Sequence, residues 1–123
     1  MSVESHLQNS SEGRPLRADE KALLSALLSH YSDFRGHEDE IASARVKDMS
    51  DGGMGSIAFI THDEKSLGTT AAEAEYSDID GVPVSIVINL DNHGRLFELD
   101  IWKADFSPLK RYPTPGLVRL RND

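Results

Sequence analysis

The sequence predicts an α+β fold, in which an N-terminal amphipathic helix packs on one face of an antiparallel sheet of about five strands. Three observations lead to this prediction. An apolar repeat near the N-terminus has the spacing of a half-buried helix. From Ala44 to Asp105, short apolar runs alternate with turns rich in glycine and aspartate. The gaps between these runs are too short for crossover helices, which favours a meander.

The length of the chain predicts one domain. A chain of 123 residues buries enough surface for a core without disulfides or metals. Residues 1–14 are polar and aperiodic, so we expect them to form a flexible tail. Residues 15–123 then form a single domain that ends in a proline-rich, basic C-terminal segment.

The predicted helix begins after Pro15. Its apolar stripe is spaced i, i+3, i+4 and i+7 and consists of Leu24, Leu27, Leu28 and Tyr31. The following connection is polar and contains Gly36, and we expect only a short helical turn there, from Glu38 to Ala42.

The predicted strands follow in order along the chain. They are ARVKDM (44–49), SIAFI (56–60), TTAAEAEY (69–76), VPVSIVINL (82–90) and RLFELDIWK (95–103). The sequence DGGMG between the first two is typical of a tight turn in which glycines take positive φ. Three prolines then interrupt regular structure, and GLVRLRND (116–123) is expected to dock as a final edge segment.

The hydrophobic pattern predicts the register of two hairpins, because a slip of one residue would move every side chain to the other face. A three-residue loop, Ile79 to Gly81, pairs Tyr76 with Val84, Ala74 with Ile86 and Ala72 with Ile88. An even-length loop, Asp91 to Gly94, pairs Leu90 with Arg95, Ile88 with Phe97, Ile86 with Leu99 and Val84 with Ile101. One face of these three strands is then apolar.

The charge of the chain limits its partners and its location. The formal net charge is −8, and residues 1–102 alone carry 8 basic and 19 acidic groups. Nucleic acid and anionic membranes would repel such a chain, so we expect neither as a partner. The N-terminus lacks the apolar core of a signal peptide and no apolar run is long enough to span a membrane, which predicts a cytoplasmic protein.

No motif in the sequence predicts catalysis. Without cysteine, thiolate zinc sites and cysteine nucleophiles are excluded. The five histidines show no metal-ligand spacing, and the glycine-rich turn lacks the ending of a phosphate loop. We therefore expect no enzymatic activity, no catalytic residues and no cofactor.

The second face of the predicted sheet is acidic. By alternation it collects the candidate contact residues Glu73, Glu75, Glu98, Asp100 and Trp102. Carboxylates around an exposed aromatic are suited to a basic protein partner, because they accelerate its encounter. The same face is also consistent with a merely solvated surface. The basic C-terminal segment, residues 103–123, is expected either to fold back on this face or to bind a partner of its own.

Three segments together resemble a known family. They are DGGMGSI (51–57), DIDGVPVSIVIN (78–89) and LFELDIWKADFSPLKRYP (96–113), whose cores are the motifs DGGMGS and ELDIWKxDFSPL. They resemble a family of small bacterial proteins classified only as a domain of unknown function. The resemblance implies a compact α+β fold and no established activity. Arg17 stands where Thr or Ser would commonly cap the first helix.

These observations predict a non-enzymatic protein-binding module. Its most specific form is an immunity protein that neutralises a basic toxin, by an analogy of size and charge. The alternative is a metal-dependent or small-ligand-binding domain that uses the same carboxylates together with Asp51 and Asp78. A third hypothesis is self-association as a homodimer through an exposed edge strand.

Overall fold

The computed structural model describes residues 13–30, 34–61 and 64–121. The elements are β1 (Arg14–Pro15), α2 (Ala18–Leu28), α3 (Phe34–Ser43), β2 (Arg45–Asp48), β3 (Ile57–Phe59), β4 (Leu67–Ser77), β5 (Pro83–Asp91), β6 (Leu96–Lys103), the 3-10 helix η1 (Pro115–Leu117) and β7 (Arg119–Leu120). Most of the expected tail, residues 1–12, lies outside the described residues. Arg14, which we assigned to that tail, belongs to β1.

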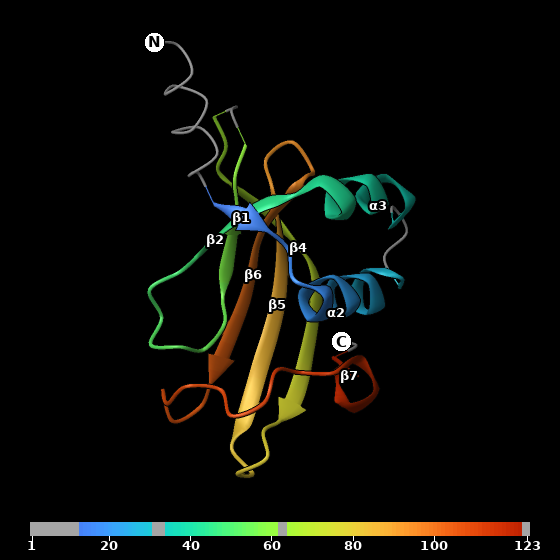
Figure 1. The fold of residues 1–123 in the computed structure, drawn as a ribbon. Coiled ribbons are helices and arrows are strands. Elements are labelled where there is room, and N and C mark those ends of the chain that lie inside the picture. The colour runs from blue at the N-terminus through green and yellow to red at the C-terminus, as the bar shows by residue number, and fades with distance from the viewer. Residues whose placement is uncertain (1–12, 31–33, 62–63, 122–123) are drawn as a thin grey trace.

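All strands of the described residues form one antiparallel sheet, which confirms the α+β class (Figure 1). The sheet has 7 strands in the order β1-β2-β3-β6-β5-β4-β7. The prediction of about five strands in a meander was therefore wrong: the sheet also includes the two-residue strands β1 and β7, and β3 pairs with β6 and not with β4. Three strand spacings of about 4.8 Å separate β3 from β4. The seven residues between these two strands (60–66) can extend to roughly 23 Å, which is more than this distance.

The register of the β4–β5 hairpin is as predicted. Tyr76 pairs with Val84, Ala74 with Ile86 and Ala72 with Ile88. The turn closes through two backbone bonds, from Asp78 N–H to the Val82 carbonyl at 3.1 Å and from Gly81 N–H to the Asp78 carbonyl at 2.8 Å. Gly81 has a φ of 82°, which explains why this position favours glycine.

The register predicted for the β5–β6 hairpin was wrong, by two residues from Val84 to Ile88 and by one residue at Leu90. Val84 pairs with Lys103, Ile86 with Ile101, Ile88 with Leu99 and Leu90 with Leu96. The register shifts between Asn89 and Leu90, where β6 carries an irregularity that takes up one residue. Leu99 and Ile101 keep their face because the error there is an even number of residues, whereas Leu96 takes the core position that was predicted for Phe97. The pattern alone therefore could not detect the shift.

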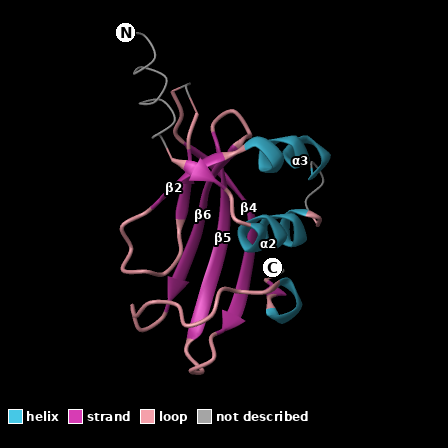
Figure 2. Ribbon diagram, in the orientation of Figure 1, coloured by secondary structure: helices cyan, strands magenta, loops and turns pink. Residues whose placement is uncertain are grey.

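The helices contribute to the core on one side of the sheet (Figures 1 and 2). Leu23, Leu24, Leu27 and Leu28 of α2 are buried and join the same cluster as the apolar side chains of the central strands. Burial of one such side chain contributes about 1.5–3 kcal/mol. Three of the four predicted stripe residues are therefore confirmed in the core, and Tyr31 lies outside the described residues.

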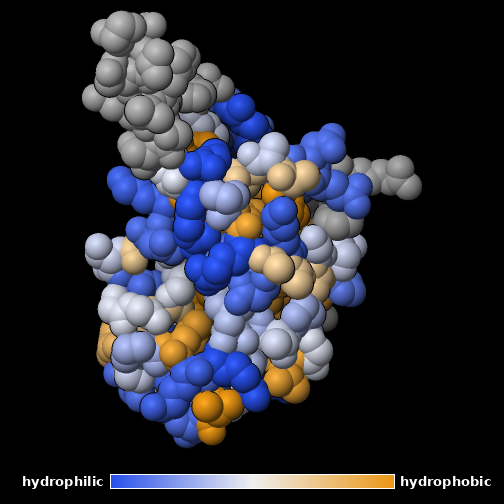
Figure 3. Space-filling view, in the orientation of Figure 1, coloured by the Kyte–Doolittle hydropathy of each residue, from blue (hydrophilic) through white to orange (hydrophobic). Residues whose placement is uncertain are grey.

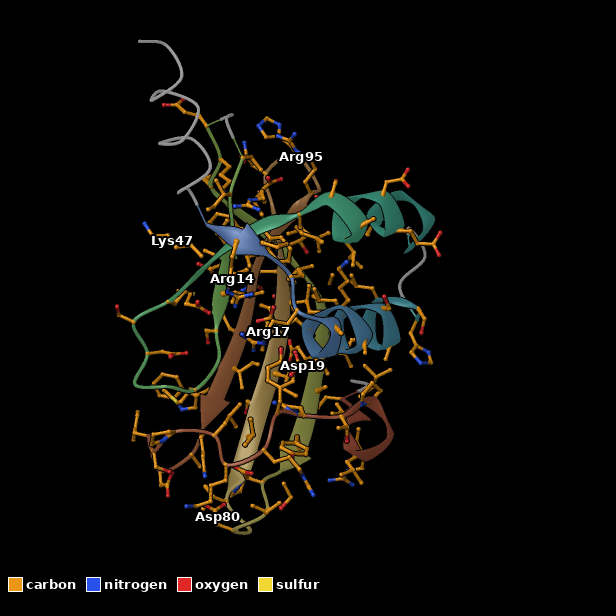
Figure 4. The ribbon with its side chains drawn as sticks, in the orientation of Figure 1. Arg14, Arg17, Asp19, Lys47, Asp80 and Arg95 are labelled. Carbon is orange, nitrogen blue, oxygen red and sulfur yellow. The ribbon has the colours of Figure 1, made fainter. Side chains whose placement is uncertain are left out.

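The N-terminal end of α2 is anchored by an acidic side chain and not by a Ser or Thr cap. Glu20 is fully buried, and its Oε1 accepts a hydrogen bond from Arg17 N–H at 2.8 Å. Arg14 donates to both carboxylate oxygens of Glu20 at 2.9 Å and pairs with Asp48 of β2 at 2.7 Å. Figure 4 shows Arg14, Arg17 and Asp19 together where the chain passes from β1 into α2.

The surface on the helix side is largely polar, with small and separate apolar spots (Figure 3). No helix of the described segments is long and apolar enough to cross a membrane.

Candidate functional site

The face of the sheet away from the core carries the predicted contact residues. Neighbouring strands align them in three rows, which run across the sheet at right angles to the strands. The rows are Lys47-Ala58-Glu98-Asn89-Thr70, Asp100-Val87-Glu73 and Trp102-Ser85-Glu75-Arg119. We call this surface the open face. Its residues are exposed or half-buried.

A pair of carboxyl groups lies at the centre of the open face. Glu98 and Asp100 are two residues apart on β6 and point to the same side. Asn89 on β5 donates its amide to Asp100 Oδ2 at 3.0 Å, and Thr70 on β4 fixes that amide by donating to Asn89 Oδ1 at 2.9 Å. Burial, followed by the negative charge of Glu98, raises the pKa of Asp100 from 3.8 to about 6.

Two exposed aromatic rings lie at the end of the same strand. Trp102 is 51% exposed and Phe106 is 62% exposed. Their centroids are 4.9 Å apart and the ring planes meet at 80°, an edge-to-face arrangement. Phe106 has a φ of 65°, which costs a side-chain-bearing residue free energy. Its N–H bonds to the Lys103 carbonyl at 2.9 Å, so the tight turn after β6 holds this ring beside Trp102.

A buried ion-pair network supports this turn from the core side. Lys103 is fully buried, and its Nζ lies 2.9 Å from Asp78 Oδ2 and 2.7 Å from Asp80 Oδ2. Asp80 lies in the turn between β4 and β5 (Figure 4). Asp78 also accepts the N–H groups of Lys110 at 2.8 Å and Arg111 at 3.1 Å.

The carboxylate of Asp78 is thereby held in its charged form. Burial opposes ionisation, but hydrogen bonds from the Lys110 N–H and the Lys103 ammonium outweigh it and lower the pKa of Asp78 to about 2. Asp78 therefore holds residues 104–114, the first part of the C-terminal segment, in place against the core.

The Asp51 loop joins the same end of the molecule. The Asp51 carboxylate accepts the N–H groups of Gly53, Met54 and Ser56 at 2.9–3.2 Å. Its three glycines have positive φ, as predicted, but the connection between β2 and β3 covers residues 49–56 and is therefore longer than the tight turn expected. Leu109 N–H bonds to the Gly53 carbonyl at 3.1 Å, which connects the loop to the C-terminal segment.

A model of the DUF6984 family, described as a domain of unknown function, matches residues 13–113. The chain belongs to this family. No curated protein and no solved structure matches the chain at a significant level.

The span that matches the DUF6984 model contains most of the features described above. It includes the carboxyl pair, the aromatic pair and the whole Lys103 network. Strand β7 lies beyond its end, at residues 119–120. The family match therefore covers the motifs that we identified in the sequence. In the structure these motifs form the Asp51 loop, β6 with the turn after it, and the segment that follows, which lie together at one end of the sheet.

The five predicted contact residues share the open face, but they are not equivalent there. Glu98, Asp100 and Trp102 follow one another on β6. Glu73 is exposed on β4. Glu75 is already engaged, with its carboxylate 3.5 Å from Arg119 and 3.3 Å from Arg121. The basic C-terminal segment therefore does reach the acidic face, at its edge.

The sequence reasoning missed two residues of this region. Phe106 was not among the predicted contact residues, although an aromatic four residues after Trp102 and directly before Ser-Pro is a usable signal for a turn that exposes a ring. Lys103 was treated as part of the basic C-terminal segment. Nothing in its local sequence indicates burial, because its two partners lie about 25 residues earlier in the chain.

The hypothesis of a metal site gains no support from the described residues. They contain no group of three or more His, Cys, Asp or Glu side chains placed to hold a metal ion. Asp51 and Asp78, which that hypothesis added to the open face, are occupied by backbone N–H groups and by Lys103.

Proposed function

We propose that this DUF6984 protein is a non-enzymatic binding module that uses its open face to bind a basic protein. The observation that carries the proposal is the exposed Trp102–Phe106 pair, which lies at the end of β6 beyond the Glu98–Asp100 carboxyl pair of the same strand. Large aromatic side chains dominate the energetics of protein interfaces, and their exposure at a strained turn is otherwise unfavourable.

The chemistry of the open face favours a cationic partner. A partner arginine that stacks on Trp102 would bring its guanidinium within reach of the neighbouring carboxylates, and arginine combines both contacts better than lysine does. The net charge of −8 adds long-range attraction, which raises the association rate at low salt.

A catalytic use of the carboxyl pair has less support. Paired carboxylates act as acid and base in concave sites that exclude water. Glu98 and Asp100 lie on the surface of a sheet, flanked by Asn89, Val87 and Ala58.

The most specific form of the binding proposal is neutralisation of a basic toxin in the cytoplasm.

The test compares two variants with a matched control. Trp102→Ala/Phe106→Ala removes the aromatic pair, and Glu98→Gln/Asp100→Asn removes the charges without changing side-chain shape. Glu38→Gln/Asp39→Asn removes the same charge from exposed positions on α3. Each protein is immobilised, and a lysate of the source organism is passed over it and eluted in salt steps.

We expect the wild type and the α3 control to retain the same basic protein, and both open-face variants to lose it. With that partner purified, the association rate of the carboxyl variant should fall by about tenfold at low salt and converge with wild type at high salt. Equal retention of one basic protein by all four proteins would contradict the proposal.

A further inference from the structure

The chain's own C-terminal strand occupies one corner of the open face. Strand β7 pairs with β4 at only two positions, Ala74 with Leu120 and Glu75 with Arg119. Arg119 and Arg121 place their guanidinium groups on the two oxygens of Glu75, at 3.5 and 3.3 Å. A basic segment of the protein therefore already pairs with one carboxylate of the open face.

The surface around Glu75 is hollowed on both sides. A groove of about 440 Å³ borders it toward the end of β4, and its lining includes Ser77, Ser85, Leu117 and Arg119. A second hollow of about 340 Å³ lies between Glu75, Arg119, Leu120 and Arg121. The groove exists because the chain leaves η1 just before Arg119, where β7 begins, so that no residue of β7 pairs with Tyr76 or Ser77. A long side chain has room to approach Glu75 from the Ser77 side.

The contacts that hold the two arginines differ from those that hold the strand. The side chains of Arg119 and Arg121 are 83% and 45% exposed, and exposed ion pairs of this kind contribute little stability. The backbone is held independently, by the bond from Arg121 N–H to the Glu73 carbonyl at 2.8 Å and by the packing of Leu120 against the core. The arginines are therefore free to leave Glu75 while β7 stays in place.

We propose that Arg119 and Arg121 are an internal competitor of the partner: a cationic side chain of the partner enters the groove beside Ser77 and Ser85, takes over the Glu75 carboxylate and releases both arginines. This inference rests on the proposed function. Ser85 lies between Trp102 and Glu75 in one row of the open face, so the groove continues the proposed contact surface to the edge of the sheet. The two arginines then weaken binding and favour partners that bring more than one cation.

The test measures the affinity of the full chain for a fluorescein-labelled deca-arginine peptide by anisotropy at low salt. Arg119→Gln/Arg121→Gln removes the competitor and leaves Leu120 in place. The control, Lys21→Gln/Lys110→Gln, removes the same charge from α2 and the C-terminal segment. Both are also made with Glu75→Gln, which completes a double-mutant cycle.

We expect the arginine variant to bind the peptide about three- to tenfold more tightly than the lysine control. This difference should disappear when Glu75 is replaced by Gln. An arginine variant that equals the lysine control, or that keeps its advantage without Glu75, would overturn the inference.

The failure of this inference is distinguishable from that of the proposed function. If Glu98→Gln/Asp100→Asn and Trp102→Ala/Phe106→Ala bind the peptide as tightly as wild type, the open face is not the binding surface and both proposals fail. If these variants lose affinity while the arginine variant equals its control, only the internal competitor is wrong.

Discussion

The two regions of the molecule that contain clustered carboxylates differ in what neutralises them. Where residues 104–114 pack beside the β4–β5 turn, Asp78 is 3% exposed and accepts hydrogen bonds from Lys103 and from backbone N–H groups. On the open face, Glu75 meets two exposed arginine side chains, and Asp100 faces a second carboxyl group.

The difference shows how one acidic chain assigns two roles to the same residue type. A carboxylate that is saturated by fixed donors stabilises the fold, because its loss leaves those donors without partners. A carboxylate that meets mobile or like-charged neighbours contributes little to stability and is available to another molecule. Four variants should break or sharpen this contrast.

The largest effect is expected for Asp78→Ala. It leaves the buried Lys103 with one carboxylate and the N–H groups of Lys110 and Arg111 without their acceptor, which should lower the free energy of unfolding by about 3–5 kcal/mol. Urea denaturation measures this loss, and Glu73→Ala on the open face is the control, with a change below about 0.5 kcal/mol. A loss for Asp78→Ala as small as that of the control would contradict the structural role.

The pH dependence of stability offers a second readout of the same substitution. The pKa of Asp78 is lowered from 3.8 to about 2, so its contribution is complete above the unfolded value and is lost as the pH falls from about 4 to about 2. In Asp78→Ala, the decrease in stability over this pH range should be smaller than in wild type.

A smaller loss is expected for Glu20→Gln. The amide cannot accept both hydrogen bonds of the Arg14 fork and the Arg17 N–H as a carboxylate does, so we expect the free energy of unfolding to fall by about 2 kcal/mol. Asp19→Asn is the control, since its side chain is 50% exposed. Similar unfolding midpoints for both variants would show that the buried fork does not anchor α2.

A gain is expected for Asp100→Asn. The pKa of Asp100 is raised from 3.8 to about 6, so the folded protein binds the Asp100 proton more tightly than the unfolded chain does. The free energy of unfolding therefore falls as the pH rises from about 4 through about 6. The amide removes the repulsion with Glu98, and since the pair is partly exposed, solvent screening limits the gain at pH 8 to about 1 kcal/mol. The thermal midpoints of variant and wild type should differ at pH 8 and coincide near pH 4. A variant that is less stable at pH 8 would argue against the repulsion.

The smallest effect is expected for Arg119→Gln/Arg121→Gln. The ion pairs with Glu75 are exposed, so the free energy of unfolding should change by less than about 0.5 kcal/mol. An unfolding midpoint close to that of wild type separates the role of these arginines in binding from any role in stability. A large loss would instead place β7 among the elements that hold the fold together.

The sequence by itself determined the class of fold, most strand positions, the β4–β5 register and the face on which Glu73, Glu75, Glu98, Asp100 and Trp102 lie. These features follow from local rules. Side chains alternate with a period of two in a strand and recur every 3.6 residues in a helix, and turn residues mark where each run ends.

Only the tertiary structure decided which strand lies beside β3, that Lys103 is buried and that Glu75 is occupied by the chain's own arginines. These features depend on residues that are far apart in the sequence, such as Asp78 with Lys103 and Glu75 with Arg119. Composition gives the number of charges but not their partners. Whether a charge is saturated, and so stabilises the fold, or remains available for binding is decided only when the strands have found their neighbours.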